Sequence, residues 1–349
     1  MEQENLRYIG GVLQGERPTA RPDWWETLGF LQCHKIAGMF YKKAIRLSLA
    51  LPHKIECILQ NIFYAQARKA KHMRSYLGEL AQTLCRKNVP HAILKGSALC
   101  NVQINGIEIY ADGERVSNDI DVLAMPEDLD AVCAVLKDLG YVQGVYDRET
   151  DTVRPFARAE ILRRRLNRGE VAPFVKRTDN AEFPFMEIDV NFSLGNTPDD
   201  GAPLLREMVR TAKLYSGKIE LCTLTPEMFF LHLIMHQYKE SCLYFAVERG
   251  KDLDAYKLAD ILYVYKAVAA RMPNILEIAQ KFGVIHRVGA VLRQVGELFG
   301  DQAVLQTAKE CGDAQPRVID YAAKKEYVWQ GGIRDRLSAF DAMRFLREV

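Results

Sequence analysis

The feature that most constrains the fold is a strand-like run, Asn118-Asp119-Ile120-Asp121-Val122-Leu123, in which two aspartates stand two residues apart. Side chains two positions apart share one face of a strand, so both carboxylates project together while Ile120 and Val122 point to the other face. Their Cα atoms would lie about 6.6 Å apart. Carboxylates at this spacing can share a pair of cations about 3.5–4 Å apart. The alternative is an edge strand or turn with two solvated carboxylates, because adjacent like charges disfavour a strand.

A second break in the pattern comes about twenty residues earlier in the chain. The apolar stretch Ala92-Ile93-Leu94 gives way at Lys95-Gly96-Ser97 to a helix-like segment. The amides of Gly96 and Ser97 at a helix start suit a phosphate, and Lys95 adds a point charge. The alternative is an ordinary strand–helix turn with a solvated lysine, since the G-x-x-x-x-G-K-[ST] pattern of a P-loop is missing.

The period of the apolar residues changes twice along the chain. It is helical over residues 24–88, with Asp23 as the N-cap of a helical segment from Trp24 and a second helix opening at Pro52. Short strands follow, and two are expected over residues 171–175 and 186–192. Helices return near 226–240, 253–270, 273–282, 285–299 and 334–348.

These changes predict an α+β protein with three regions: a small mixed β-sheet core flanked by two helical regions. The N-terminal helical region covers residues 1–88, the α/β core covers residues 89–224, and the C-terminal helical domain covers residues 225–349.

Composition excludes several classes of protein. The 349 residues carry a net charge of +2, which predicts no strong field for duplex nucleic acid or an anionic membrane. The first residues hold no long apolar run, and no window approaches the roughly 18 apolar residues of a spanning helix. We therefore expect a cytoplasmic protein with no membrane partner. Eight scattered cysteines without a C-x-x-C pair predict buried, reduced thiols, rather than disulfides or a zinc site.

Several short motifs occur together in a known order. They are Leu94-Lys95-Gly96, Arg115, Asp119-Ile120-Asp121-Val122-Leu123, Gly140-Tyr141 and Glu187-Ile188-Asp189-Val190-Asn191. In this combination the chain resembles the polymerase-β-type nucleotidyltransferase superfamily, and most of all its bacterial branch of uncharacterised nucleotidyltransferases. The resemblance is specific over about residues 90–240. Asn191 departs from the branch, where a histidine is common.

The resemblance implies a third carboxylate on a strand beside the aspartate pair. Glu187 and Asp189 share a face, so parity cannot separate them. The position between Ile188 and Val190 matches the superfamily pattern better, which favours Asp189, with Glu187 as neighbour or substitute.

The resemblance further implies transfer of a nucleoside monophosphate from an NTP to an acceptor hydroxyl, with release of pyrophosphate. Asp119, Asp121 and Asp189 would be the catalytic residues and would bind Mg²⁺ or Mn²⁺. Lys95, Gly96 and Ser97 would bind the nucleotide phosphates. Arg115 would contact phosphate or tie its turn to the sheet.

Other residues and other functions stay open from the sequence. His236 and Lys257 are further candidates for the same cleft, although charged helix surface explains them equally well. The acceptor is expected to be a small molecule or a protein, with RNA as a further candidate. The alternatives to an active enzyme of this kind are a catalytically weak nucleotide-binding or protein-interaction protein, and an RNA-directed enzyme that acts on tRNA ends.

Overall fold

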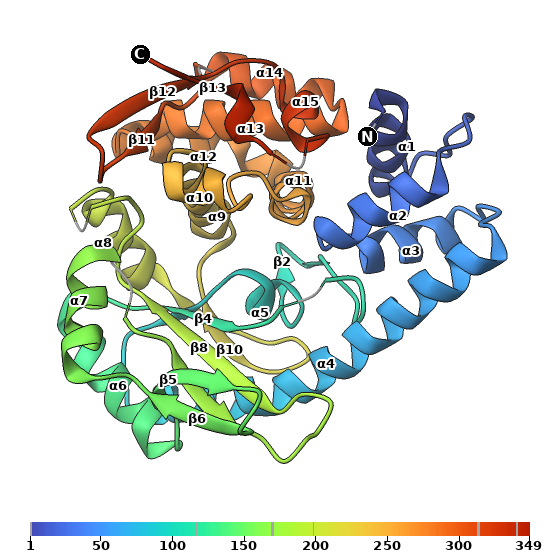
Figure 1. The fold of residues 1–349 in the computed structure, drawn as a ribbon. Helices are drawn as coiled ribbons and strands as arrows, with labels where there is room; N and C mark the ends of the chain where they lie inside the picture. Colours follow the sequence, from blue (N-terminus) through green and yellow to red (C-terminus); the bar gives the residue numbers. More distant parts are fainter. Residues whose placement is uncertain (1, 116, 169–170, 198, 313–314, 340) are drawn as a thin grey trace. The chain divides into compact units, whose positions relative to one another are not determined.

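The structure is a computed structural model that describes residues 2–115, 117–168, 171–197, 199–312, 315–339 and 341–349. Figure 1 follows the chain from its N-terminal helices through a mixed sheet to its C-terminal helices, which confirms the α+β fold. The chain forms two compact units. The helical unit comprises Met1–Gln66, Gly113–Arg115 and Phe230–Val349, and the sheet unit comprises Ala67–Asp112 and Val116–Phe229.

The division into three regions stays a prediction, and the compact units divide the chain in another way. The first 66 residues and the last 120 belong to one unit. The border between the units falls inside α4 (His53–Arg86) and inside α9 (Pro226–Ser241).

The sheet unit is built on a mixed sheet of eight described strands, in the order β6-β5-β7-β8-β4-β1-β10-β9. The strands of this sheet are β1 (Ala92–Ile93), β4 (Ile120–Leu123), β5 (Val142–Asp147), β6 (Thr152–Pro155), β7 (Phe174–Arg177), β8 (Phe185–Asn191), β9 (Lys213–Tyr215) and β10 (Leu221–Thr223). The remaining elements of the unit are α5 (Lys95–Leu99), β2 (Gln103–Ile104), β3 (Ile107–Glu108), η1 (Pro126–Asp128), α6 (Leu129–Asp138), α7 (Arg158–Arg168) and α8 (Ala202–Thr211).

Two central strands carry the residues singled out by the sequence. β4 and β8 are parallel neighbours, as expected, and Ile120 lies across from Ile188. Ile120, Val122, Ile188 and Val190 are buried in the core, because alternate positions of a strand face the same layer. The predicted strand at 171–175 is displaced toward the C-terminus, since β7 begins at Phe174, one residue after Pro173.

The helical unit contains most of the chain's helices. Its described elements are α1 (Gln3–Gln14), α2 (Trp24–Cys33), α3 (Ala37–Arg46), α10 (Tyr244–Glu248), α11 (Ala255–Val268), η2 (Ala269–Arg271), α12 (Met272–Lys281), α13 (Ile285–Phe299), α14 (Gln302–Glu310), β11 (Val318–Asp320), β12 (Lys325–Trp329), α15 (Ile333–Leu337), η3 (Met343–Phe345) and β13 (Leu346–Glu348).

The start of α2 follows the prediction, because the Asp23 carboxylate accepts hydrogen bonds from the amides of Trp25 and Glu26. The expected continuous segment beyond Trp24 is wrong in one respect. It breaks into α2 and α3, and Lys35 between them has a φ of 57°, in the left-handed region.

The predicted helix over residues 334–348 is wrong beyond Leu337. The end of the chain forms β13, which pairs antiparallel with β12, so that Tyr327 lies across from Glu348 and Trp329 from Leu346. Pairing with a distant strand outweighs the local helical period here, because the ladder satisfies backbone groups that a short terminal helix would leave open.

Two expectations from composition can be compared with the structure. The eight cysteines are free thiols, but only Cys100, Cys242 and Cys311 are buried, so the expectation of general burial is wrong. Among the helices of the described residues, none is both long and apolar enough to cross a membrane.

Candidate active site

Strand register brings three aspartates together in the sheet unit. Asp121 on β4 lies directly across from Asp189 on the parallel strand β8. Asp119 precedes Asp121 by two residues and therefore projects to the same side. Carboxylate oxygens of all three residues lie within 4.8 Å of one another. Because the side-chain period of a strand is two, a shift of one residue in the pairing would place Asp189 on the opposite face.

The polar face of β8 is half-buried along its length. Glu187, Asp189 and Asn191 alternate with Met186, Ile188 and Val190, whose side chains are buried. The apolar residues hold the strand in the core, and the polar residues on the other face stay within reach of solvent. The acidic positions are therefore anchored by the packing of their neighbours.

Lys95 contacts the cluster directly. Its Nζ donates to Asp121 Oδ1 at 2.7 Å, and the Asp121 side chain is only 5% exposed. Lys95 has a φ of 48°, a left-handed conformation that is uncommon outside glycine and often found at functional positions. Lys95 follows β1 and Leu94 directly in the chain. The Leu94 amide donates to the Asp121 carbonyl, which holds the start of this turn against β4. The same carboxylate oxygen also accepts from Asn191 Nδ2 at 3.4 Å.

The turn before β4 is tied down by three side chains. The hydroxyls of Ser97 and Ser117 both donate to the Asp119 carbonyl, at 3.2 and 3.0 Å. Lys69 Nζ on α4 donates to Asn118 Oδ1 at 2.6 Å. Gly96 and Ser97 occupy the first turn of α5, where helical amides have no acceptor within the helix. Lys69 was not among the predicted site residues, since a lysine on a long polar helix looks like an ordinary surface residue.

Glu187 lies on the same face of β8 but is not part of the three-carboxylate group. Burial raises the pKa of its carboxyl above the ordinary value, and the nearby charge of Asp119 raises it further. A fourth carboxyl beside three others is expected to hold its proton more tightly.

The remaining candidates belong to the helical unit and make their own ion pairs there. Arg115 is buried, donates to both carboxylate oxygens of Asp260 on α11, and stacks 4.3 Å from the Tyr256 ring. These contacts hold the segment Gly113–Arg115 against α11. The sequence had suggested two other roles for Arg115, contact with phosphate or a link between its turn and the sheet.

Lys257 and His236 meet at one carboxylate. Lys257 donates to Glu240 and lies 3.3 Å from Asp254, while His236 Nε2 lies 3.8 Å from Glu240. Lys257 is buried, and the pKa of its ammonium is nonetheless raised, because the nearby acids outweigh desolvation. The positive charge of Lys257 is matched by acids, which is the usual requirement for burying it.

The gathered carboxylates set the chemistry available to the sheet unit. Oxygen ligands from three aspartates suit a hard divalent cation such as Mg²⁺ or Mn²⁺. The Lys95 ammonium at Asp121 offsets part of their mutual repulsion. A bound cation would offset more of it, so the residues fit a metal.

Two comparisons with known proteins bear on this site. A search of curated proteins finds no match to the chain. A family model described as uncharacterised nucleotidyltransferase matches residues 20–300, which include the three aspartates and Lys95. The match covers most of the chain, so the protein belongs to the uncharacterised nucleotidyltransferase family and is a transferase enzyme of that class.

Proposed function

We propose that the protein transfers a nucleoside monophosphate from an NTP to an acceptor hydroxyl in a metal-dependent reaction that releases pyrophosphate. The observation that carries the proposal is the group formed by Asp119, Asp121 and Asp189, whose oxygens lie within 4.8 Å of one another. Membership of a nucleotidyltransferase family supplies the reaction class.

Asp119, Asp121 and Asp189 would hold Mg²⁺ or Mn²⁺. When bound, such ions neutralise the phosphate oxygens and stabilise the charge that develops in phosphoryl transfer. The carboxylates themselves fix the position of that charge, because Asp121 and Asp189 are held in register by two neighbouring strands.

The turn after β1 would bind the triphosphate. Lys95 can exchange its contact with Asp121 for a phosphate oxygen, and the amides of Gly96 and Ser97 stand at the start of α5 beside it. These groups orient the nucleotide and take no proton. We assign Arg115 to holding the segment before β4, because its guanidinium is engaged by Asp260.

The acceptor hydroxyl must lose a proton as the new bond to phosphorus forms. Asp189 on β8 is half-buried, as Asp119 is, and its carboxylate would accept this proton. The bond that breaks joins the α-phosphorus to the bridging oxygen, and pyrophosphate leaves with the electron pair.

Incubation with each α-labelled NTP tests the proposal, with Mg²⁺ or Mn²⁺ present and candidate small molecules, proteins and RNA supplied in turn. We expect metal-dependent release of pyrophosphate and transfer of label to one class of acceptor, both abolished by EDTA. Asp189→Asn should lose both signals. Turnover that persists in EDTA or in Asp189→Asn would refute the assignment of the site.

A further inference from the structure

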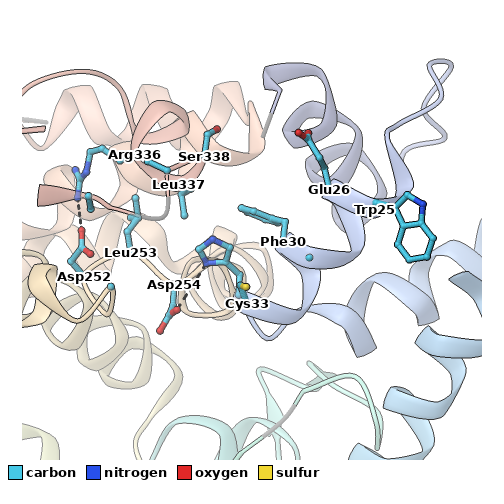
Figure 2. A pocket seen from close by; sticks show the side chains of 15 residues that line it. Trp25, Glu26, Phe30, Cys33, Asp252, Leu253, Asp254, Arg336, Leu337 and Ser338 are labelled. Carbon is cyan, nitrogen blue, oxygen red and sulfur yellow. Dashed lines mark hydrogen bonds and ion pairs between the residues drawn. The ribbon is translucent and has the colours of Figure 1, made fainter. Parts of the chain in front are cut away.

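A pocket of about 350 Å³ lies within the helical unit, and none of its lining residues is among those proposed for nucleotide transfer. Three segments far apart in the sequence line it: one face of α2, the loop before α11, and α15 with the residues after it (Figure 2). Its volume falls within the range of small-molecule sites, about 300–1,000 Å³. The third segment lies beyond residue 300, where the family match ends.

The face of α2 supplies both an apolar floor and a charge. Glu26, Phe30 and His34 follow one another at helical spacing and line the pocket together. Figure 2 shows the Phe30 ring and the Glu26 carboxylate, which stands one helical turn away. The rings of Phe30 and His34 are in contact. The centroids of the two rings are 4.1 Å apart.

Gly29 leaves open space on the same helix face. It lines the pocket, and a Cβ added to it would meet no atom within 4 Å. A glycine inside a helix costs about 1 kcal/mol relative to alanine. The missing side chain here keeps the pocket open.

The opposite wall is largely apolar, and its charges are already matched. Leu253 and Leu337 face α2 across the pocket, and Ala339 also lines it. The guanidinium of Arg336 donates to Asp252 at 2.8 Å and stacks on the Trp329 ring. An incoming anion would therefore meet a guanidinium that a carboxylate already neutralises.

His34 adds no positive charge. Its Nδ1 accepts from the Ala255 amide at 3.4 Å, and burial lowers the pKa of the imidazole despite the neighbouring Asp254. Asp254 in turn lies 3.3 Å from Lys257.

Glu26 differs from these matched groups. Its Oε2 accepts from Asn5 Nδ2 at 2.8 Å and from the Glu2 amide at 3.2 Å, which fix the carboxylate without neutralising it. No lysine or arginine among the described residues forms an ion pair with Glu26. The pocket therefore combines apolar walls, an aromatic ring and one carboxylate with which no lysine or arginine of the described residues pairs.

We propose that this pocket binds a small organic cation, a primary amine carried on an apolar or aromatic body. The body would pack between Phe30 and the leucines of the opposite wall, and the ammonium would meet the Glu26 carboxylate. An ammonium near a carboxylate and an aromatic face is favoured by both contacts. This site is independent of the proposed nucleotide transfer.

Calorimetric titration of the full chain at pH 7 and low salt tests the proposal. The probes are tryptamine and indole-3-propionate, which share an indole body and differ in the sign of their charge. Because the charged contact is partly exposed, we expect tryptamine to bind about tenfold more tightly than indole-3-propionate.

Two variants locate the binding. Glu26→Gln keeps an acceptor for Asn5 and should abolish the preference for the amine. Gly29→Leu should fill the pocket and reduce binding of both probes at least about tenfold, while a leucine is a better helix former than glycine. Gly78→Leu on α4 is the matched control, because a Cβ there also meets no atom within 4 Å.

The possible results of these titrations either support or overturn the proposal. Loss of binding in Gly29→Leu together with loss of charge preference in Glu26→Gln supports the proposal. Absence of tryptamine binding, equal affinity for both probes, or wild-type binding by Gly29→Leu would overturn it. NTP turnover plays no part in the readout, so failure of the proposed enzyme activity leaves this test unaffected.

Discussion

The sheet unit and the helical unit handle charge in opposite ways. In the sheet unit, strand pairing brings Asp119, Asp121 and Asp189 together, although like charges repel. In the helical unit, buried charges of opposite sign meet, as in Arg115–Asp260 and Arg336–Asp252. Gathering like charges lowers stability unless a ligand offsets them, whereas matching opposite charges makes burial tolerable. The first arrangement is typical of a functional site and the second of a structural contact.

The comparison predicts different effects in the two units. Replacing an acid of the sheet unit's aspartate group should lower activity, whereas replacing a paired acid of the helical unit should lower stability. Asp121→Asn should lower NTP turnover by at least about 100-fold, because it removes a proposed metal ligand. Its melting temperature should stay close to that of the wild type, because the relief of repulsion from Asp119 and Asp189 offsets the lost ion pair with Lys95. Steady-state pyrophosphate release and thermal melts measure the two effects.

Asp138→Asn is the matched control for Asp121→Asn, because Asp138 is an exposed acid paired with a lysine, Lys87. It should change neither quantity. Turnover in Asp121→Asn equal to that of this control would remove Asp121 from the active site.

The next largest effect is expected at Asp252 in the helical unit. Asp252→Asn would leave Arg336 buried without its acid, and Nε and Nη1 of that arginine already have no hydrogen-bond partner among the described residues. Breaking such a buried pair should cost about 3 kcal/mol of unfolding free energy. Urea denaturation measures this loss.

The double variant Asp252→Asn/Arg336→Met sharpens the result. Removing both charges should restore part of the stability, because an apolar replacement of a buried pair is often tolerated. A double variant less stable than Asp252→Asn alone would show that Arg336 stabilises the unit through some contact other than Asp252.

A substitution of Lys95 tests whether the ammonium that contacts Asp121 binds the nucleotide. Lys95→Gly removes the charge and suits the positive φ at this position, so the fold should be kept. Nucleotide affinity should weaken by about 1.5–3 kcal/mol, the range of a charge-assisted hydrogen bond. Equilibrium binding of a non-hydrolysable NTP with Mg²⁺ measures it, with Lys87→Ala as the exposed control.

Unchanged nucleotide affinity in Lys95→Gly would show that the turn at residues 95–97 has a structural role and does not bind the nucleotide through Lys95. A fall in affinity that also appears in Lys87→Ala would point to general charge rather than a specific contact.

The smallest effect concerns pH, and it should appear in both units. Burial lowers the pKa of His34 in the helical unit and of His91 in the sheet unit. An unfolded histidine therefore binds a proton more readily than the folded one, so stability is complete above the unfolded pKa, about 6.5, and declines as pH falls below it.

Thermal melts between pH 7.5 and 5 test this sign. His91→Asn keeps a side-chain donor for the Val89 carbonyl, which the His91 ring contacts at 2.8 Å, and should reduce the acid-induced loss. Wild-type stability that rises over this pH range as acid is added would contradict the burial argument.

The two sites also differ in how far the sequence could predict them. The spacing of Asp119 and Asp121 within an apolar run indicates a shared strand face, because alternation is a local property of two residues. The resemblance pointed to Asp189, and the pairing of β4 with β8 brings it into the group. Lys95 and Ser97 were candidates for the same reason, since a strand–helix turn is visible in a few consecutive residues.

Other features depended on contacts between distant residues. The buried partner of Arg115 is Asp260, and the partner of the last strand is β12, so neither follows from the local period. The local pattern after residue 333 is helical, and a strand ladder overrides it.

The sequence by itself therefore determined which residues share a strand face, where most helices begin, and which acids were candidates for the active site. Only the tertiary structure decided which charges are paired in the helical unit and that Glu26, Gly29 and Phe30 line a pocket with residues near 253 and 337. The physical reason is range: side-chain period and helix capping act over a few residues, whereas a pocket exists only when separate segments pack against one another.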